Sequence, residues 1–351
     1  MIGGAASGME RAGGEAGARL DRPAPAGARV RFPDSFGRRF AIFADAEEEF
    51  DWSQPFSREA VATTAVAALP EGTRRLNAAG VVPTYLADYP IANDPRSAAI
   101  VAELAAAGAC DVGVQLHPWV TPPFDEVVSA RNSFAGNLPP ALEAAKLRAT
   151  TERVAEATGV RPIVYRAGRY GVGPSSVAAI RAAGHRLDVS VRPLFDYSAE
   201  GGPDFRAATP DPWWAAEDLL EAPLGVTLVG ALRRWGRLPH SAAARALLAR
   251  TGLLARVALT PEGTPIAAAC AAVQAMLADG ARFLSFSFHT PSLAPGHTPY
   301  VRDAAGLARF WRWWDAMFDL LAREGVTAVR PDELIAAAEA GRDLSAGGTP
   351  R

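Results

Sequence analysis

The sequence has little cysteine, almost no lysine and no long apolar run. Its two cysteines, Cys110 and Cys270, cannot form a metal cluster or a disulfide framework, and we expect both to be reduced, buried thiols. Lys146 is the only lysine among 36 basic residues, which we attribute to a compositional preference for arginine. The longest strongly apolar stretch, 266–278, is too short to span a bilayer, so no membrane association is predicted.

The charge balance also excludes whole classes of function. The 36 basic and 38 acidic residues leave a net charge of −2, which lacks the basic footprint expected for nucleic-acid binding. The first 30 residues are rich in Gly, Ala and Arg and contain no apolar signal region. We therefore expect residues 1–35 to be a disordered leader and the protein to be cytoplasmic.

Short apolar runs alternate with helical patterns along the chain. Predicted strands lie at 40–43, 81–86, 111–116, 162–165, 187–191, 283–288 and 326–329. Predicted helices lie at 57–69, 95–107, 139–158, 174–183, 264–279, 303–323 and 331–340. This alternation predicts an α/β fold with a parallel sheet and surrounding helices, and the number of repeats favours a barrel.

One domain is expected to contain all of these elements. It covers 36–340 and is followed by a flexible tail at 341–351. The segment 192–262 contains several prolines and a Gly-Gly pair and fits the alternation poorly. We interpret it as a long insertion that caps a site, because long loops in compact domains are usually functional or disordered.

Polar and ionisable side chains collect where the predicted strands end, which in parallel sheets and barrels is the active-site face. They are Asp45, Glu47, His117, Arg166, Asp188 and His289. Asp45 and Glu47 are two residues apart, so in extended chain they face the same side. One carboxylate can then remain ionised as a metal ligand while the other accepts a proton from water.

Other catalytic templates are missing from the sequence. There is no Gly-x-Ser-x-Gly elbow, no Gly-x-x-x-x-Gly-Lys phosphate loop and no Cys-x-x-Cys pair. Gly171-Val-Gly173 lacks the third glycine of a dinucleotide fingerprint. A nicotinamide or ATP enzyme is therefore disfavoured.

Five segments in order resemble the polysaccharide deacetylases, or NodB-like carbohydrate esterases, and most closely their WalW-like branch. The segments are Phe-Ala-Asp45-Ala-Glu47, Gly113-Val-Gln-Leu-His117-Pro-Trp, Tyr165-Arg166-Ala-Gly-Arg169-Tyr170-Gly171, Asp188-Val-Ser-Val and Ser-Phe-His289-Thr-Pro. The resemblance implies a distorted (β/α)₇ barrel. It also implies that a divalent metal, usually zinc, assists removal of an acetyl group from an N-acetylated sugar.

The resemblance assigns roles to individual residues. Asp45 matches the base, Arg166 the arginine that orients it, and His289 the general acid. Glu47 matches the second acidic position, usually an aspartate that binds the metal. Four further residues are expected to bind substrate: Arg169, Tyr170, Trp119 and Asp188.

The second motif departs from the family pattern. It normally carries two metal-binding histidines four residues apart, and those positions are Gln115 and Trp119 here. His117 lies between them on the same side as Gln115, so we predict that it is a shifted metal ligand. The third motif has Gly168-Arg169 where a single proline is usual.

Three functions therefore remain open. The first is a metal-dependent deacetylase. The second is a metal-independent amidohydrolase in which His117 and His289 transfer protons and Arg169 holds an anionic substrate. The third is a non-catalytic glycan-binding protein. In each case the expected partner is a carbohydrate or small amide, and the sequence indicates no oligomeric state.

Overall fold

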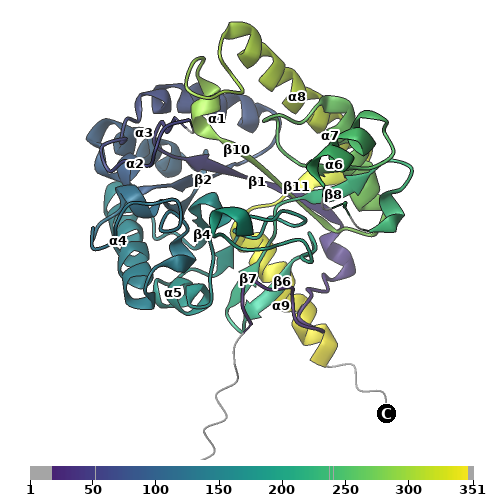
Figure 1. Ribbon diagram of the computed structural model, residues 1–351, viewed down its shortest axis with the longest axis horizontal. Helices are drawn as coiled ribbons and strands as arrows, with labels where there is room; N and C mark the ends of the chain where they lie inside the picture. Colours follow the sequence, from purple (N-terminus) through teal and green to yellow (C-terminus); the bar gives the residue numbers. More distant parts are fainter. Residues whose placement is uncertain (1–17, 52, 237, 240, 347–351) are drawn as a thin grey trace, which may run out of the picture.

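A nine-stranded sheet forms the centre of the computed structural model, which describes residues 18–346 except 52, 237 and 240 (Figure 1). The strand order is β10-β1-β2-β3-β4-β5-β7-β6, and β11 also pairs with β1. All of these pairings are parallel except that of β6 with β7. The bounds are β1 Arg38–Ala46, β2 Thr84–Ala87, β3 Asp111–Leu116, β4 Val164–Ala167, β5 Leu187–Asp188, β6 Trp213–Ala216, β7 Leu219–Glu221, β10 Phe283–His289 and β11 Val326–Ala328.

The sheet closes through single hydrogen bonds instead of a regular ladder. A separate hairpin of β8 (Val226–Val229) and β9 (Ala255–Ala258) lies at the closure. Gly225 N donates to Ser285 O at 2.9 Å, Ser287 N donates to Leu259 O at 3.1 Å, and Leu259 N donates to Gly225 O at 2.8 Å. The first two bonds connect the hairpin to β10 and the third lies within the hairpin, so the predicted α/β fold is confirmed as a distorted barrel.

Five of the seven predicted helices occur within two residues of their expected bounds, and the helix predicted at 331–340 begins as expected but continues to Ala346. The helices are α1 Leu69–Ala78, α2 Tyr89–Asn93, α3 Pro95–Ala106, α4 Pro140–Thr158, α5 Ser176–Ala182, α6 Ala242–Arg250, α7 Ile266–Ala278, α8 Ala304–Arg323 and α9 Pro331–Ala346. The predicted helix at 57–69 is wrong, because only a 3₁₀ turn at Thr64–Ala68 lies there. The helix begins after it, since Pro70 suits a first helical turn and disrupts a helix interior.

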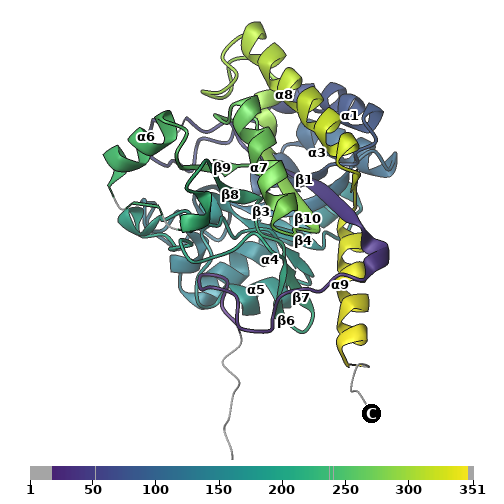
Figure 2. The same ribbon diagram turned by 90° about the vertical axis from the view of Figure 1, so that its right-hand side faces the viewer.

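The alternation of side chains in β10 determines which residues reach the interior. Phe286 and Phe288 point outward, and each ring centroid lies 5.8 Å from that of Trp314 on α8. Ser287 and His289 point inward, to the cavity described below. Figure 2 shows α7 and α8 packed side by side outside this strand. The aromatic face of α8 thus covers the barrel wall whose inner side carries polar groups.

Parts of the predicted boundaries lie outside the described residues, namely 1–17 of the leader and 347–351 of the tail. Within the leader range, Leu20 is fully buried and Val30 N donates to Pro212 O at 2.9 Å beside β6. The packed chain therefore begins before residue 36. Within the tail range, α9 continues to Ala346.

The predicted insertion and the cysteines also differ in detail from expectation. The segment 192–262 contributes β6 and β7 to the main sheet and forms the β8–β9 hairpin and α6. Cys110 is buried as expected, but Cys270 is only partly buried. No helix in the described part of the chain is long and apolar enough to cross a bilayer.

Candidate active site

A cavity of about 240 Å³ opens at the carboxyl ends of β1, β3, β4 and β10. Eight of the ten predicted site residues line it: Asp45, Glu47, Gln115, His117, Arg166, Arg169, Tyr170 and His289. The parallel register explains part of this convergence, because Asp45 is the pairing partner of His289, and Gln115 that of Arg166.

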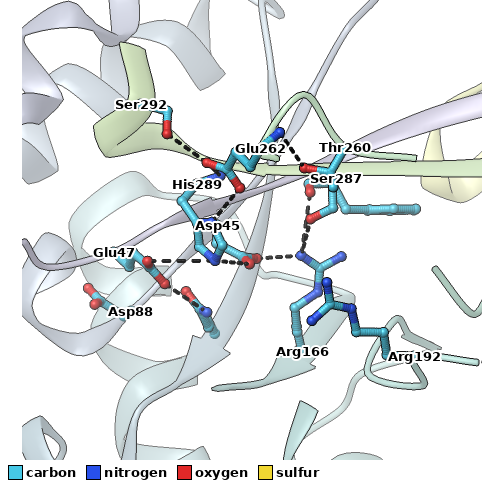
Figure 3. A network of polar contacts seen from close by, with 12 residues as sticks. Asp45, Glu47, Asp88, Arg166, Arg192, Thr260, Glu262, Ser287, His289 and Ser292 are labelled. Atoms are coloured by element: carbon cyan, nitrogen blue, oxygen red, sulfur yellow. Dashed lines mark hydrogen bonds and ion pairs between the residues drawn. The ribbon is translucent and has the colours of Figure 1, made fainter. Parts of the chain in front are cut away.

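Arg166 fixes the position of the Asp45 carboxylate. Its Nη1 donates to Asp45 Oδ1 at 2.5 Å and to Ser287 Oγ at 2.8 Å, and its Nε donates to Val189 O at 3.2 Å (Figure 3). Both charged side chains are almost fully buried, at 1% and 3% exposure. This pairing leaves Asp45 Oδ2 directed to the cavity, 3.7 Å from His289 Nε2.

His289 is held from behind by Glu262, a residue that the sequence prediction missed. Glu262 Oε2 lies 2.6 Å from His289 Nδ1, and its Oε1 accepts from the His289 backbone N and from Ser292 Oγ. Burial lowers the pKa of His289, but the carboxylates of Glu262, Glu47 and Asp45 outweigh it and raise that pKa well above its usual value. Nε2 of the imidazole faces the cavity, 3.7 Å from Asp45 Oδ2 and 3.9 Å from Glu47 Oε1.

His117 is held in the same manner by a second missed carboxylate, that of Glu48. His117 Nδ1 lies 2.7 Å from Glu48 Oε2, and Trp119 Nε1 donates to Glu48 Oε1 at 3.0 Å. The indole also stacks on the imidazole at 4.4 Å between ring centroids. With Nδ1 turned to Glu48, Nε2 is the ring nitrogen that faces the cavity, 3.6 Å from Glu47 Oε2.

Asp88 completes the support behind His117. One of its carboxyl oxygens accepts from Glu48 N and the other from Ile91 N, which caps α2, both at 2.9 Å. Burial raises the pKa of Asp88 well above its usual value and that of Glu48 to about 7. The oxygens of both residues are already hydrogen-bonded, so this buried set serves as a support and not as an ion site.

Gly168 allows His117 to reach the cavity. A Cβ at this glycine would lie 2.7 Å from Leu116 O and 2.8 Å from His117 Nε2, with Cδ2 nearer still. Only glycine fits there, which gives a physical reason for the altered third motif. The next two residues, Arg169 and Tyr170, adopt φ values of 55° and 59°, which non-glycine residues rarely do.

Arg169 lies in the cavity wall with several partners of its own. Its guanidinium forms an ion pair with Glu200, donates to Ser133 Oγ at 2.5 Å and lies 4.1 Å from the centroid of the Phe134 ring. The charge of Arg169 is thus paired with Glu200, and its binding of an anionic substrate stays a prediction.

The two remaining predicted site residues, Trp119 and Asp188, do not line the cavity. Trp119 is 1% exposed and supports Glu48. Asp188 is fully buried, accepts from Ser190 Oγ at 2.5 Å and neighbours Glu221 in the β5–β7 pairing. The Trp119 indole is turned to Glu48 and Asp188 Oδ1 to Ser190, so neither group faces the cavity, and their predicted binding of substrate stays untested.

The Glu47 carboxylate lies between the imidazoles of His117 and His289. Its Oε2 lies 3.6 Å from His117 Nε2 and its Oε1 lies 3.9 Å from His289 Nε2, while Gln115 Nε2 donates to Oε2 at 3.1 Å. Burial raises the pKa of Glu47 to about 7, although both histidines lower it. Asp45, Glu47 and His289 together have ligand atoms within 4.8 Å of one another. With Asp45 paired to Arg166, the donors that would hold a divalent ion such as zinc are the Glu47 carboxylate and Nε2 of His117, whose ring Glu48 supports from behind.

Comparisons with known proteins identify the fold. No family model matches the sequence, and no curated protein matches it. A protein from Mycobacterium smegmatis, provisionally named a polysaccharide deacetylase, superposes with a TM-score of 0.52 at 18% identity, covering 94% of this chain and 97% of its own. At this identity the likeness shows the fold alone, which is that of the NodB-like deacetylases. The WalW-like branch stays a prediction.

Two more distant structures have lower scores. A 4-alpha-glucanotransferase from Thermococcus litoralis has a TM-score of 0.47 and 11% identity over 90% of this chain and 41% of its own. A family 4 carbohydrate esterase from Streptomyces lividans, in complex with acetate, has a TM-score of 0.40 and 13% identity over 84% of this chain and 92% of its own. Neither match carries an argument about activity.

Proposed function

We propose that the protein is a hydrolase that removes an acetyl group from an N-acetylated sugar. The observation that carries the proposal is the convergence of Asp45, Glu47 and the Nε2 atoms of His117 and His289 on one cavity. Amide hydrolysis needs a base for water, a proton for the leaving amine and charge stabilisation at the carbonyl oxygen. The resemblance in sequence and the shared fold agree with this chemistry.

Each side chain has a task that follows from its partners. Glu47 and His117 would hold a divalent metal, which polarises the amide carbonyl and acidifies water. Asp45 Oδ2 accepts the proton of the attacking water, since Oδ1 is bound to Arg166. His289 Nε2 donates a proton to the departing nitrogen, and Glu262 stabilises the imidazolium and fixes its orientation.

A second candidate is a hydrolase on the same scaffold that works without metal. Gln115 favours it, because its amide donates to Glu47 Oε2, the oxygen that also faces His117. In that case Asp45 and His289 would still supply the base and the acid. The two candidates differ in one respect, which is whether turnover survives removal of metal.

The test is acetate release from N-acetylglucosamine oligomers. We expect Asp45→Asn to lose at least about 100-fold in rate, the usual scale of acid–base catalysis, and to melt at a lower temperature while remaining folded at the assay temperature, because the buried Arg166 loses its counter-charge. The matched control is Asp51→Asn, which removes the same charge from an exposed carboxylate. Chelation followed by zinc or cobalt separates the two candidates. Equal rates for Asp45→Asn and wild type would refute the role of Asp45 as base.

A further inference from the structure

The cavity contains one cation whose charge no carboxylate balances. Of its three arginines, Arg166 is paired with Asp45 and Arg169 with Glu200. Arg192 forms no ion pair within 4.0 Å with any residue that the structure describes. The charge pattern of the cavity is therefore uneven, with acidic groups beside β1 and an unbalanced guanidinium across from them (Figure 3).

Aromatic rings hold Arg192 in place. Its Cζ lies 3.9 Å from the ring centroid of Phe195 and 4.9 Å from that of Tyr170, and its Nη1 donates to Tyr197 Oη at 2.8 Å. Its Nε is buried and has no hydrogen-bond partner among the described atoms. A guanidinium fixed in this way is preorganised to bind, because its rotamer is settled before a ligand arrives.

A second arginine increases the excess of positive charge. Arg256 lies over the same Phe195 ring at 3.4 Å, and its Nη1 donates to Leu194 O at 2.6 Å. Burial and the neighbouring Arg192 lower the pKa of Arg256. Partly buried like charges are costly unless an opposite charge compensates them, and the described side chains supply none within ion-pair distance.

A further unpartnered donor lies in the same wall. Arg166 is only 1% exposed, and its Nη2 has no hydrogen-bond partner in the part of the chain that the structure covers. The Cζ atoms of Arg166 and Arg192 lie 5.9 Å and 4.9 Å from the centre of the Tyr170 ring, so this ring adjoins both guanidiniums. Arg166 is balanced by Asp45 and interacts with the buried Asp188 and Glu221, so the guanidinium left to match an oxyanion ligand is that of Arg192.

We propose that the cavity selects N-acylated sugars that carry an anionic group, and that Arg192 binds this anion. The inference rests on the proposed function and specifies its substrate class. A carboxylate or a phosphate on the sugar would satisfy the same guanidinium. The anion would supply the counter-charge that Arg192 lacks. The acyl amide of the same sugar would then lie beside Asp45 and His289.

The test compares sugars that differ in charge. The probes are N-acetylmuramic acid with a carboxylate, N-acetylglucosamine 6-phosphate with a phosphate, and neutral N-acetylglucosamine. We expect kcat/KM for one of the anionic sugars to exceed that for the neutral sugar by roughly 10- to 100-fold, the usual value of a hydrogen-bonded charge pair. The anionic sugar with the higher kcat/KM shows whether Arg192 binds a carboxylate or a phosphate.

The variants assign that preference to Arg192. Arg192→Gln is expected to reduce the ratio of anionic to neutral kcat/KM to about 3-fold or less, and Arg192→Lys to retain part of it through its charge. The control is Arg250→Gln, which removes an exposed charge at the end of α6. No preference in the wild type, or an unchanged ratio in Arg192→Gln, would overturn the inference.

Binding of the deacylated sugars separates this inference from the proposed function. Calorimetry with muramic acid, glucosamine 6-phosphate and glucosamine needs no turnover. Acetate release without discrimination between the sugars would refute the anion site and keep the hydrolase. Tighter binding of an anionic sugar by wild type than by Arg192→Gln, without acetate release, would keep the anion site and refute the hydrolase.

Discussion

Replacing Gly168 with alanine tests how His117 reaches the cavity. The new Cβ would lie 2.8 Å from His117 Nε2 and 2.7 Å from Leu116 O, whereas non-bonded carbon contacts relax at about 3.5–4.0 Å. The ring must therefore retreat by about 1 Å. Glu48 and the stacked Trp119 confine it on the other sides, so Nε2 would leave its position opposite Glu47.

The expected loss of activity follows from the size of this displacement. Misplacing a reacting group by about 1 Å costs on the order of 100-fold in rate, or about 2.7 kcal/mol of transition-state stabilisation. Overpacking should also lower the free energy of unfolding by about 1–3 kcal/mol. The assay is kcat/KM for acetate release together with zinc affinity measured by competition with a chelator.

Gly159→Ala is the control for the loss of stability. Gly159 has φ of +69°, and a Cβ added there would meet no atom within 4 Å, so alanine costs about 1–2 kcal/mol away from the site. Both variants should lose stability, but only Gly168→Ala should lose activity and zinc affinity. A folded Gly168→Ala protein with wild-type activity and affinity would refute the reasoning.

Three further predictions concern the supports of the site and the fold. Glu48→Gln should weaken zinc binding about 10- to 100-fold in competition titrations, because it removes the carboxylate behind His117; unchanged affinity would contradict this. Arg166→Lys should lower kcat about 100-fold with less effect on KM, because lysine cannot replace the fork that holds Asp45; steady-state kinetics would show it. The pKa of His185 is lowered from 6.5 to about 3 by burial, so the unfolded chain binds the proton more readily and stability falls as pH drops below 6.5. Urea unfolding at pH 7 and pH 5 should show a loss about 2 kcal/mol larger for wild type than for His185→Asn, and equal losses would refute the shift.

The sequence indicated which edge of the sheet carries the candidate site, because the strand–helix alternation can be recognised locally and predicts parallel strands. Asp45 follows Phe43 on the inward face of β1, and the β1–β10 register then places His289 beside it. The burial of every residue from Phe40 to Ala46 in β1 agrees with a strand covered on both faces. The order of the strands in the sequence was therefore enough to predict which residues meet at the strand ends.

The supporting carboxylates could not be predicted in the same way. Glu262 lies in the segment that had been interpreted as an insertion, and it reaches His289 because Ser287 N bonds to Leu259 O nearby. Glu48 alternates away from Asp45 and Glu47, so the pattern places it outside the site. It acts nonetheless, through Nδ1 of a histidine whose Nε2 faces the cavity.

The unbalanced arginine was equally hidden from sequence reasoning. Arg169 lies within the third motif and was the natural choice for an anion ligand. Its pairing with Glu200 and the position of Arg192 between aromatic rings depend on how the segment after β5 folds back over the cavity. Neither contact has a periodic signature, because each joins loops through side chains alone.

Anomalous diffraction at the zinc edge from crystals of the tag-free protein, equilibrated with zinc, tests the central claim most directly. The account predicts one strong peak in the cavity, about 2.0–2.2 Å from His117 Nε2 and from a Glu47 carboxylate oxygen. The same crystals of His117→Ala should lose that peak. A wild-type cavity without an anomalous peak, or a peak that persists without the imidazole, would contradict the account.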